Sequence, residues 1–250
     1  MTPRFLSAAA LALVAPLAQA ASAPSPAVTA ALADPARPAE DRARDAARHP
    51  AELLAFAGIK PGMKVADFIM GGGYWTRILA KTVGEKGKVY AYQPKQFIEY
   101  KADYATDQDK AVAGYTNVVP SRESLAEVSF PEPLDAIMTV QNWHVLLLMM
   151  SPPGFAGGLA KQLYASLKPG GVLLIVDHVG APGAAPFAAA ESLHRGDAAA
   201  TRAEVEAAGF TFAGESKLLA SAADPHTALV FDPAIRGKTD QFVYLFRKGK

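Results

Sequence analysis

Short apolar runs of strand length alternate with helical patterns along most of this chain, and this alternation constrains the fold more than any other feature. Strand-like runs separated by helices form βαβ units, in which the strands are parallel and helices cover both faces of the sheet. The runs that we interpret as strands are 64–70, 88–93, 117–120, 134–140, 172–176, 210–219 and 241–246. The sequence therefore predicts an α/β fold with a doubly wound, mostly parallel sheet.

Several of the helical patterns have recognisable ends. Asp197 is placed to cap the start of the last pattern, and Gly209 and Gly58 are placed to end two of them, because glycine readily adopts the left-handed backbone found after a helix. The helical patterns are 40–48, 50–56, 74–83, 155–167 and 198–208.

The first twenty residues carry the pattern of a secretory signal peptide. Arg4 supplies a positive charge, residues 5–17 are apolar, and Ala18-Gln19-Ala20 is a small-x-small cleavage site. The apolar stretch is shorter than the ~20 residues that a membrane span needs, and Pro16 interrupts it, which favours a cleaved leader over an anchor. We expect cleavage after Ala20 and a periplasmic or secreted protein with no stable membrane insertion.

The segment after the signal peptide differs in composition from the rest of the chain. Residues 21–37 are rich in Ala, Pro and Ser, which is typical of a flexible linker. We therefore expect the folded domain to span residues 38–250. That length is typical of a single domain.

Charge and cysteine content exclude several function classes. The formal net charge is +1, and basic residues alternate with acidic ones along the chain. A partner nucleic acid bound through its phosphates is therefore not expected. The chain has no cysteine, which excludes disulfides, thiolate metal sites and a cysteine nucleophile.

Three consecutive glycines, Gly71, Gly72 and Gly73, separate the first predicted strand from the helix that follows it. Glycine removes Cβ atoms where a ligand must approach the backbone, and the start of the next helix offers free N–H groups. A tight turn also needs glycine, so composition alone leaves both interpretations open. The position favours a ligand, because doubly wound sheets bind ligands at the carboxyl ends of their strands.

Other segments agree with this interpretation when they are taken together. In chain order they are 55–63, the glycine turn, Asn142-Trp143-His144, Asp177-His178, Leu193-His194-Arg195, 204–210 and 235–240. The combination resembles a family of exported predicted methyltransferases from bacteria, which belongs to the class I S-adenosylmethionine-dependent methyltransferase superfamily. The resemblance extends over nearly all of the chain after the signal peptide.

The resemblance implies a Rossmann-like sheet of seven strands with an antiparallel strand near the C-terminus. It also implies S-adenosylmethionine as the cofactor and methyl transfer to an unidentified small-molecule acceptor. The residues that it assigns to cofactor binding are Asp67, Gly71, Gly72, Gly73, Gln93 and Asn142. Asp67 is expected to orient the glycine loop near the amino-acid end of the cofactor, Gln93 to face the ribose, and Asn142 to lie near the transferred methyl group.

Two positions depart from the pattern of the superfamily. Ile69 occupies the first glycine position of the turn. Gln93 ends the second strand where a carboxylate normally binds the ribose hydroxyls. A glutamine oxygen can accept one hydrogen bond but lacks the charge that makes a carboxylate contact stronger. Weaker cofactor binding is the expected consequence.

Histidines form a second group of candidates. His144 follows the fourth strand, His178 the fifth, and His194 lies in the next connection. Their imidazoles can act as general bases or, with Asp177, as metal ligands, and each can also be a hydrogen-bonded structural residue. We take these three histidines as the candidate catalytic residues and assign no residue to a metal.

The signal peptide conflicts with the proposed cofactor, because S-adenosylmethionine is made in the cytoplasm. Two other functions therefore remain open. One is a non-catalytic or repurposed Rossmann-like protein that binds a small ligand outside the cytoplasm. The other is a metal-dependent hydrolase that uses the histidines.

Overall fold

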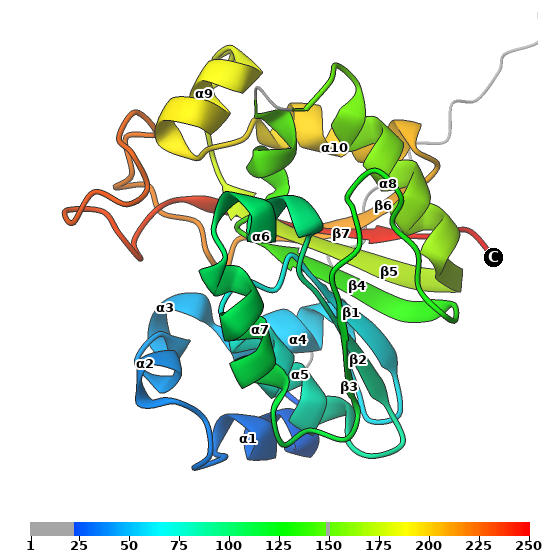
Figure 1. The fold of residues 1–250 in the computed structure, drawn as a ribbon. Helices are drawn as coiled ribbons and strands as arrows, with labels where there is room; N and C mark the ends of the chain where they lie inside the picture. The colour runs from blue at the N-terminus through cyan, green and yellow to red at the C-terminus, as the bar shows by residue number, and fades with distance from the viewer. Residues whose placement is uncertain (1–22, 149–150) are drawn as a thin grey trace, which may run out of the picture.

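The computed structural model describes residues 23–148 and 151–250, which form one seven-stranded sheet with helices around it (Figure 1). The strand order is β3-β2-β1-β4-β5-β7-β6. Strands β1 to β5 are parallel, and β7 runs antiparallel to both β5 and β6. The strands are β1 (Lys64–Phe68), β2 (Lys88–Tyr92), β3 (Val118–Ser121), β4 (Leu134–Val140), β5 (Leu167–His178), β6 (Thr211–Ser216) and β7 (Gln241–Arg247). The predicted doubly wound α/β fold is confirmed.

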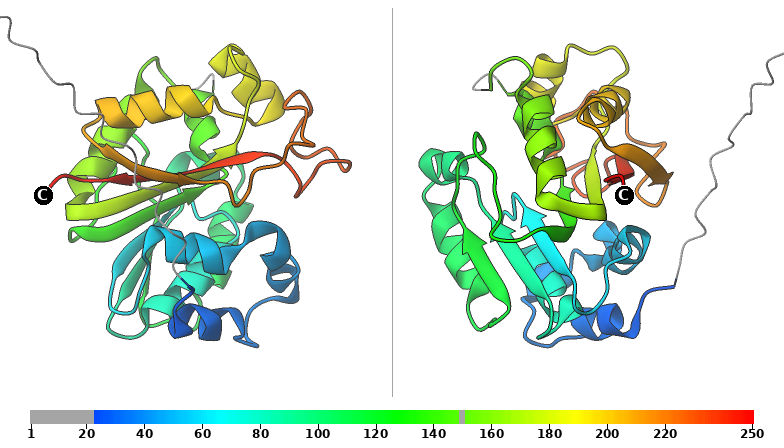
Figure 2. Two further views of the ribbon diagram at one scale, coloured as in Figure 1. Left: turned by 180° about the vertical axis from the view of Figure 1, so that it is seen from behind. Right: turned by 90° about the vertical axis from the view of Figure 1, so that its right-hand side faces the viewer.

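Helices cover both faces of this sheet, so its central strands are buried on both sides. In Figure 1 and in the left view of Figure 2, α8 and α10 lie on one side of the sheet and α4 on the other. The helices are α1 (Pro26–Leu32), α2 (Ala39–Arg42), α3 (Asp45–Arg48), α4 (Pro50–Ala57), α5 (Tyr74–Val83), α6 (Lys95–Tyr100), α7 (Asp103–Val112), the 3₁₀ helix η1 (Trp143–Leu147), α8 (Phe155–Ser166), α9 (Pro186–Leu193) and α10 (Ala198–Ala207).

Two hydrophobic cores follow from the alternation of side chains along each strand. Leu174 of β5 packs into the core under α1, α4 and α5, whereas its neighbours Leu173 and Ile175 pack into the core under α8 and α10. Successive residues of a strand point to opposite faces, so an unbroken apolar run supplies both cores. This arrangement explains why the central strands appear in the sequence as continuous apolar runs.

Local signals predicted several boundaries correctly. The side chain of Asp197 accepts a hydrogen bond from the backbone N–H of Ala200 at 2.9 Å and caps α10. Gly209 follows that helix with φ 108°, and Gly58 ends α4 with φ 70°. The pattern over 40–48 forms two short helices, α2 and α3, where a single helical stretch was predicted.

The predicted flexible linker over 21–37 is wrong for residues 26–32, which form α1. Ser25 caps this helix by accepting a hydrogen bond from the N–H of Val28, and Pro26 occupies its first turn. Val28 and Ala31 are buried in the same core as α5. Alanine is a strong helix former as well as a linker residue, so only the packing decides between the two. The predicted signal peptide, residues 1–20, lies outside the described residues.

A helix that crosses a bilayer must be both long and apolar. None of the helices within 23–148 and 151–250 combines the length and the apolar character that such a crossing needs.

Candidate functional site

The glycine loop connects β1 to α5 and is held by backbone hydrogen bonds. The N–H of Met70 donates to the carbonyl of Tyr92 at 3.0 Å, and the N–H of Gly73 donates to the carbonyl of Met70 at 3.1 Å. Gly71 and Gly73 have φ values of 54° and 80°, a region that favours glycine. A Cβ at Gly73 would lie 2.2 Å from Cβ of Ala111, whereas one at Gly71 would meet no described atom within 4 Å. Packing therefore requires Gly73, while Gly71 borders open space.

Gln93 is fully buried behind this loop, at the end of β2. Its Oε1 accepts a hydrogen bond from the N–H of Gly71 at 3.0 Å, and its Nε2 has no partner among the described residues. The glutamine oxygen expected to receive a ribose hydroxyl is thus already bonded to the loop. The part of the Gln93 amide that has no partner among the described residues is therefore an N–H donor, while Oε1 keeps a second lone pair.

The ends of β1 and β4 share an unusual backbone conformation. Ile69 follows β1 with φ 62°, and Gln141 follows β4 with φ 63°. Residues with a Cβ in this region store strain of about 1–3 kcal/mol, and such strain concentrates at functional sites. The side-chain Nδ2 of Asn142 donates to the carbonyls of Ile69 at 3.0 Å and Val140 at 2.8 Å. Asn142 therefore joins the two strand ends, and its predicted position near a methyl group stays a prediction.

Asp67 is buried at the end of β1 and connects this strand to the first turn of α5. Its Oδ2 accepts a hydrogen bond from Oγ1 of Thr76 at 2.5 Å. Burial raises the pKa of Asp67 from its ordinary value of 3.8 to about 6, and the hydrogen bonds from Thr76 act in the opposite direction. The predicted role of orienting the glycine loop is consistent with this contact, because Thr76 lies in the helix that the loop enters.

Replacing Asp67 with asparagine tests this burial through pH. Folding raises the pKa of Asp67, so its contribution to stability is fully present below its ordinary pKa and is lost as the pH rises through about 6. The asparagine variant has no such loss, and the hydroxyl of Thr76 can donate or accept. We expect the unfolding free energy of Asp67→Asn to be about 3 kcal/mol higher than that of the wild type at pH 8. Below pH 4 the two unfolding free energies should be equal. Urea unfolding at both pH values measures this difference, and a difference independent of pH would contradict the prediction.

Charged contacts hold the N-terminal helices α2 and α3 beside the glycine loop. Asp45 accepts two hydrogen bonds from the guanidinium of Arg37, at 2.7 and 2.8 Å, and one from the Tyr74 hydroxyl at 2.7 Å. The guanidinium of Arg48 lies 4.6 Å from the centre of the Tyr74 ring and donates to Oε1 of Gln141 at 3.2 Å. The sequence predicted a charged helical stretch here. It did not predict that this stretch covers the ends of the strands.

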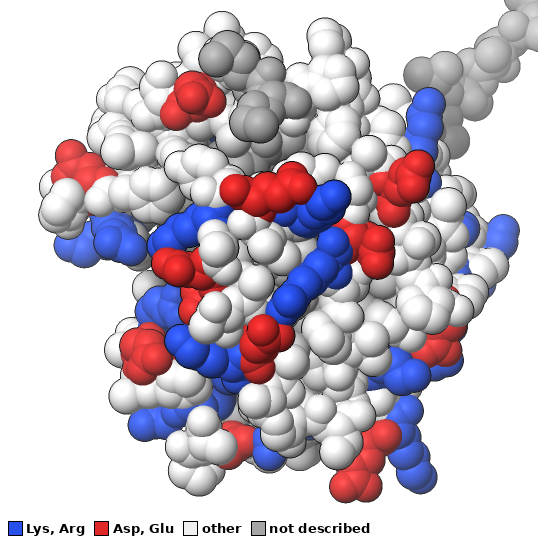
Figure 3. All heavy atoms as spheres, viewed as in Figure 1, with Lys and Arg blue, Asp and Glu red and all other residues white. Residues whose placement is uncertain are grey.

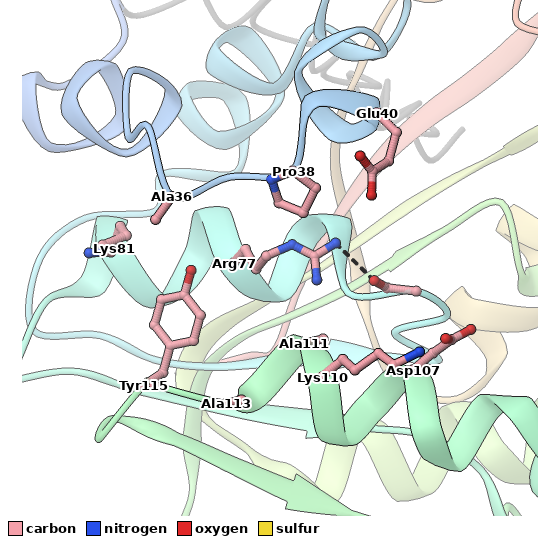
Figure 4. Close-up of a pocket in the computed structure, with 12 residues that line it drawn as sticks. Ala36, Pro38, Glu40, Arg77, Lys81, Asp107, Lys110, Ala111, Ala113 and Tyr115 are labelled. Carbon is pink, nitrogen blue, oxygen red and sulfur yellow. Dashed lines mark hydrogen bonds between the residues drawn. The ribbon is translucent and has the colours of Figure 1, made fainter.

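A hollow of about 530 Å³ lies beside the glycine loop, between the N-terminal segment, α5 and α7 (Figure 4). Gly72 and Arg77 line it, and Arg77 donates to the carbonyl of Gly72 at 2.9 Å. Lys81 and Lys110 also line it, together with the acidic residues Glu40 and Asp107. No histidine lines this hollow, so it is separate from the histidine cluster.

The three candidate histidines do come together, and Asp177 anchors them. Asp177 is fully buried in β5 and accepts from the backbone N–H groups of His144 at 2.6 Å and His178 at 2.8 Å. Nδ1 of His144 lies 2.9 Å from Oδ1 and 3.0 Å from Oδ2 of the same carboxylate. Nε2 of His144 lies 3.3 Å from Nδ1 of His194. The sequence placed Asp177 here only as a metal ligand.

The environment keeps two of these rings neutral at pH 7. Burial lowers the pKa of His178 to about 4, and Nδ1 of this ring lies 2.8 Å from the hydroxyl of Thr239. Burial, with the neighbouring His144 ring, also lowers the pKa of His194. Burial acts to raise the pKa of Asp177, but the two histidines together lower this pKa by a larger amount. The carboxyl is therefore charged at neutral pH.

Metal ligation by the same cluster would need several side chains directed at one point. Within the described part of the chain, no group of three or more His, Asp or Glu side chains is arranged to hold a metal ion. Asp177 and His194 engage both ring nitrogens of His144.

Known structures resemble this fold. A SAM-dependent methyltransferase from Aquifex aeolicus is 24% identical, with a TM-score of 0.54 over 78% of this chain and 87% of that one. The N-methyltransferase NodS from Bradyrhizobium japonicum is 11% identical, with a TM-score of 0.57 over 84% and 99%. A possible exported protein from Bordetella parapertussis is 16% identical, with a TM-score of 0.53 over 81% and 67%.

These likenesses establish the fold: the chain has a seven-stranded, Rossmann-like architecture that it shares with these methyltransferase structures. Comparison with models of known protein families gave no match, and comparison with curated protein sequences gave none either.

Proposed function

We propose that this protein transfers a methyl group from S-adenosylmethionine to a small-molecule acceptor. The observation that carries the proposal is the glycine loop at the end of β1. There Gly71 borders open space and the buried amide of Gln93 still has an unpartnered N–H group among the described residues. A buried donor without a partner is costly, and a bound ligand that accepts from it removes the cost. The likeness of the whole sheet to known methyltransferases supports the choice of ligand.

The residues present fit such a cofactor on the side of the glycine loop. The backbone of Gly71 and Gly72 and the amide of Gln93 would contact it, with Asp67 holding the loop through Thr76. The bound cofactor supplies a methyl group that its sulfonium already activates. The protein then has to position the acceptor, exclude water and, for a hydroxyl acceptor, remove a proton. The histidine cluster, joined to the loop region through Asn142, is the group suited to that last task.

Isothermal titration with S-adenosylmethionine and S-adenosylhomocysteine tests the cofactor, and Gln93→Glu sharpens the test. One oxygen of the introduced carboxylate can keep the bond to the Gly71 N–H. The other takes the place of Nε2 and accepts from a ribose hydroxyl, which can donate to a carboxylate as well as accept from an amide N–H. A hydrogen bond to a charged group contributes about 1.5–3 kcal/mol against about 1 for a neutral one. We therefore expect Gln93→Glu to bind S-adenosylmethionine about fivefold more tightly.

The matched control is Gln93→Met, which keeps the length of the side chain and loses both polar atoms. It is expected to bind more weakly than the wild type, because the N–H of Gly71 loses its acceptor. Weaker binding by Gln93→Glu would mean that this position does not meet the ribose.

The second candidate is a repurposed Rossmann-like protein that binds another small ligand outside the cytoplasm. Two observations favour it: Gln93 offers a donor where the superfamily has an acceptor, and Ile69 takes a strained conformation where it has glycine. The signal-peptide pattern of residues 1–20 supports export under either function. A folded protein that binds neither S-adenosylmethionine nor S-adenosylhomocysteine would favour this candidate.

A further inference from the structure

The hydrogen bonds of the histidine cluster fix where its protons lie. A carboxylate only accepts hydrogen bonds, so Nδ1 of His144, which faces Asp177, carries a hydrogen. In the neutral ring Nε2 of His144 is then an acceptor, and the hydrogen of its 3.3 Å contact belongs to Nδ1 of His194. The remaining nitrogen, Nε2 of His194, then has a lone pair without a hydrogen-bond partner among the described residues.

We propose that Asp177, His144 and His194 form a proton relay, and that Nε2 of His194 is the base that takes the proton of a phenol-type methyl acceptor. The inference rests on the proposed methyl transfer. The acceptor hydroxyl gives its proton to Nε2 of His194, while the hydrogen on Nδ1 of His194 moves to Nε2 of His144. The positive charge then lies on His144, next to the carboxylate of Asp177, and the acceptor oxygen becomes the anion that methyl transfer needs. Asp177 and His144 are positioning residues in this scheme.

The charged groups around His194 are compatible with a neutral base. Glu191 lies on the same helix, α9, and Asp177 and His144 face the ring from β5 and η1. Arg195, the next residue, is neutralised by its ion pair with Asp224. Burial lowers the pKa of His194, so its lone pair is available at pH 7.

The surface around His194 indicates the class of acceptor. The His194 ring lies 4.8 Å from the ring of Phe231, which is 51% exposed. Five large apolar residues are exposed in the described part of the chain, and three of them, Phe187, Leu229 and Phe231, lie on α9 or on the segment that pairs with its end. In Figure 3 charges of both signs are intermixed over α2, α6 and α7, whereas the surface around α9 is mostly uncharged. The aromatic ring of a phenol suits this surface. A phenol hydroxyl is neutral and must lose its proton to a base before methyl transfer, whereas a carboxylate acceptor has no proton to lose.

Nitrogen-15 NMR of the full chain reads the proton positions directly, without cofactor. The chain has five histidines, so each ring can be assigned from single variants. From the hydrogen-bond geometry, we expect the hydrogen to lie on Nδ1 of both His144 and His194, with Nε2 of each ring as an acceptor. In His144→Phe the Nδ1–H of His194 loses its acceptor, and this ring is expected to move to the Nε2–H form that predominates in water. His226→Asn, which removes a ring bonded to Asp240, is the control and should leave His194 unchanged.

The wild-type spectrum decides the proposal even if His144→Phe does not fold. A hydrogen on Nε2 of His194 in the wild type, or a doubly protonated His144 at pH 7, would overturn the relay. Titration with 4-nitrophenol should shift the Nε2 resonance of His194, and an unchanged resonance at saturation would overturn the acceptor class.

Methyltransferase activity provides an independent test of His194 as the base. With phenol as acceptor, His194→Gln is expected to lower kcat by about 10²–10⁴-fold at pH 7. The loss should be smaller with 4-nitrophenol, which ionises more readily, and an equal loss with both would overturn the role of base. If NMR finds the expected proton positions in a protein that does not bind S-adenosylmethionine, that outcome contradicts the proposed function and leaves the relay intact.

Discussion

Replacing Gly73 with valine is expected to destabilise the domain by about 2–5 kcal/mol. Two effects add. A residue with a Cβ at φ 80° costs about 1–2 kcal/mol, and the new Cβ would meet Cβ of Ala111 at 2.2 Å, where overpacking costs about 1–3 kcal/mol. Urea unfolding measures the sum, and a loss below 1 kcal/mol would contradict it.

Gly71→Ala is the matched control, because Gly71 also has a left-handed backbone, with φ 54°, and its Cβ would meet no described atom within 4 Å. We expect this variant to lose only about 1–2 kcal/mol and to stay folded. Its binding of S-adenosylhomocysteine should fall more than tenfold, because the methyl group would occupy the open space beside the loop. Normal binding by folded Gly71→Ala would remove the glycine loop from the proposed site.

The clash can be separated from the backbone strain by a double-mutant cycle. Ala111→Gly removes the atom that the introduced valine would meet, at a cost of about 1 kcal/mol for glycine within α7. In the Ala111→Gly background, Gly73→Val should lower the unfolding free energy by less than it does in the wild type. Equal costs in both backgrounds would show that packing against α7 does not restrict this position.

Arg195→Leu is expected to destabilise the domain by about 3–5 kcal/mol. Arg195 and Asp224 are both buried and form a bidentate pair, with both N–O distances at 2.9 Å. Arg195 also donates to the carbonyls of Val179 at 2.8 Å and Ala228 at 2.9 Å, so it fastens the long segment before β7 to the end of β5. Removing the guanidinium leaves Asp224 buried without its cation.

The pH dependence follows from the same pair. Burial acts to raise the pKa of Asp224, but the hydrogen bonds and charge of Arg195 and the backbone N–H groups of His226 and Asp240 together lower it by more. Its net pKa in the folded protein therefore lies below the ordinary value. In the wild type this contribution to stability is present above the ordinary pKa and is lost as the pH falls through the lowered value. In Arg195→Leu only burial and the backbone N–H bonds remain, so the destabilisation should be larger at pH 7 than at pH 4.

A second substitution provides the control. Asp224 also accepts from the N–H groups of Asp240 at 2.7 Å and His226 at 3.0 Å, and an asparagine in its place keeps an oxygen for such bonds without the charge. Arg195→Leu with Asp224→Asn should therefore be more stable at pH 7 than Arg195→Leu alone. Equal stability of the two variants in urea would show that the unpaired charge is not the cause of the loss.

The candidate site was only partly predictable. The sequence located His144, His178 and His194 near one another, because the carboxyl ends of parallel strands meet at one edge of the sheet. It did not show that Asp177 binds the ring of His144, or that the oxygen of Gln93 is bonded to Gly71. These contacts join residues 33 and 22 positions apart, and they depend on the distance between neighbouring strands and on side-chain rotamers.

The sequence by itself determined the order of the strands, some of the helices and several helix ends, such as those at Gly58 and Asp197. These features depend on local patterns of burial and on the backbone preferences of single residues. The sequence did not predict α6, α7 or α9. Only the tertiary structure decided that residues 26–32 form a helix, because the helix is stabilised by packing in the same core as α5. It also decided the direction of each hydrogen bond in the histidine cluster, since an imidazole donates or accepts according to the partner that the fold places beside it.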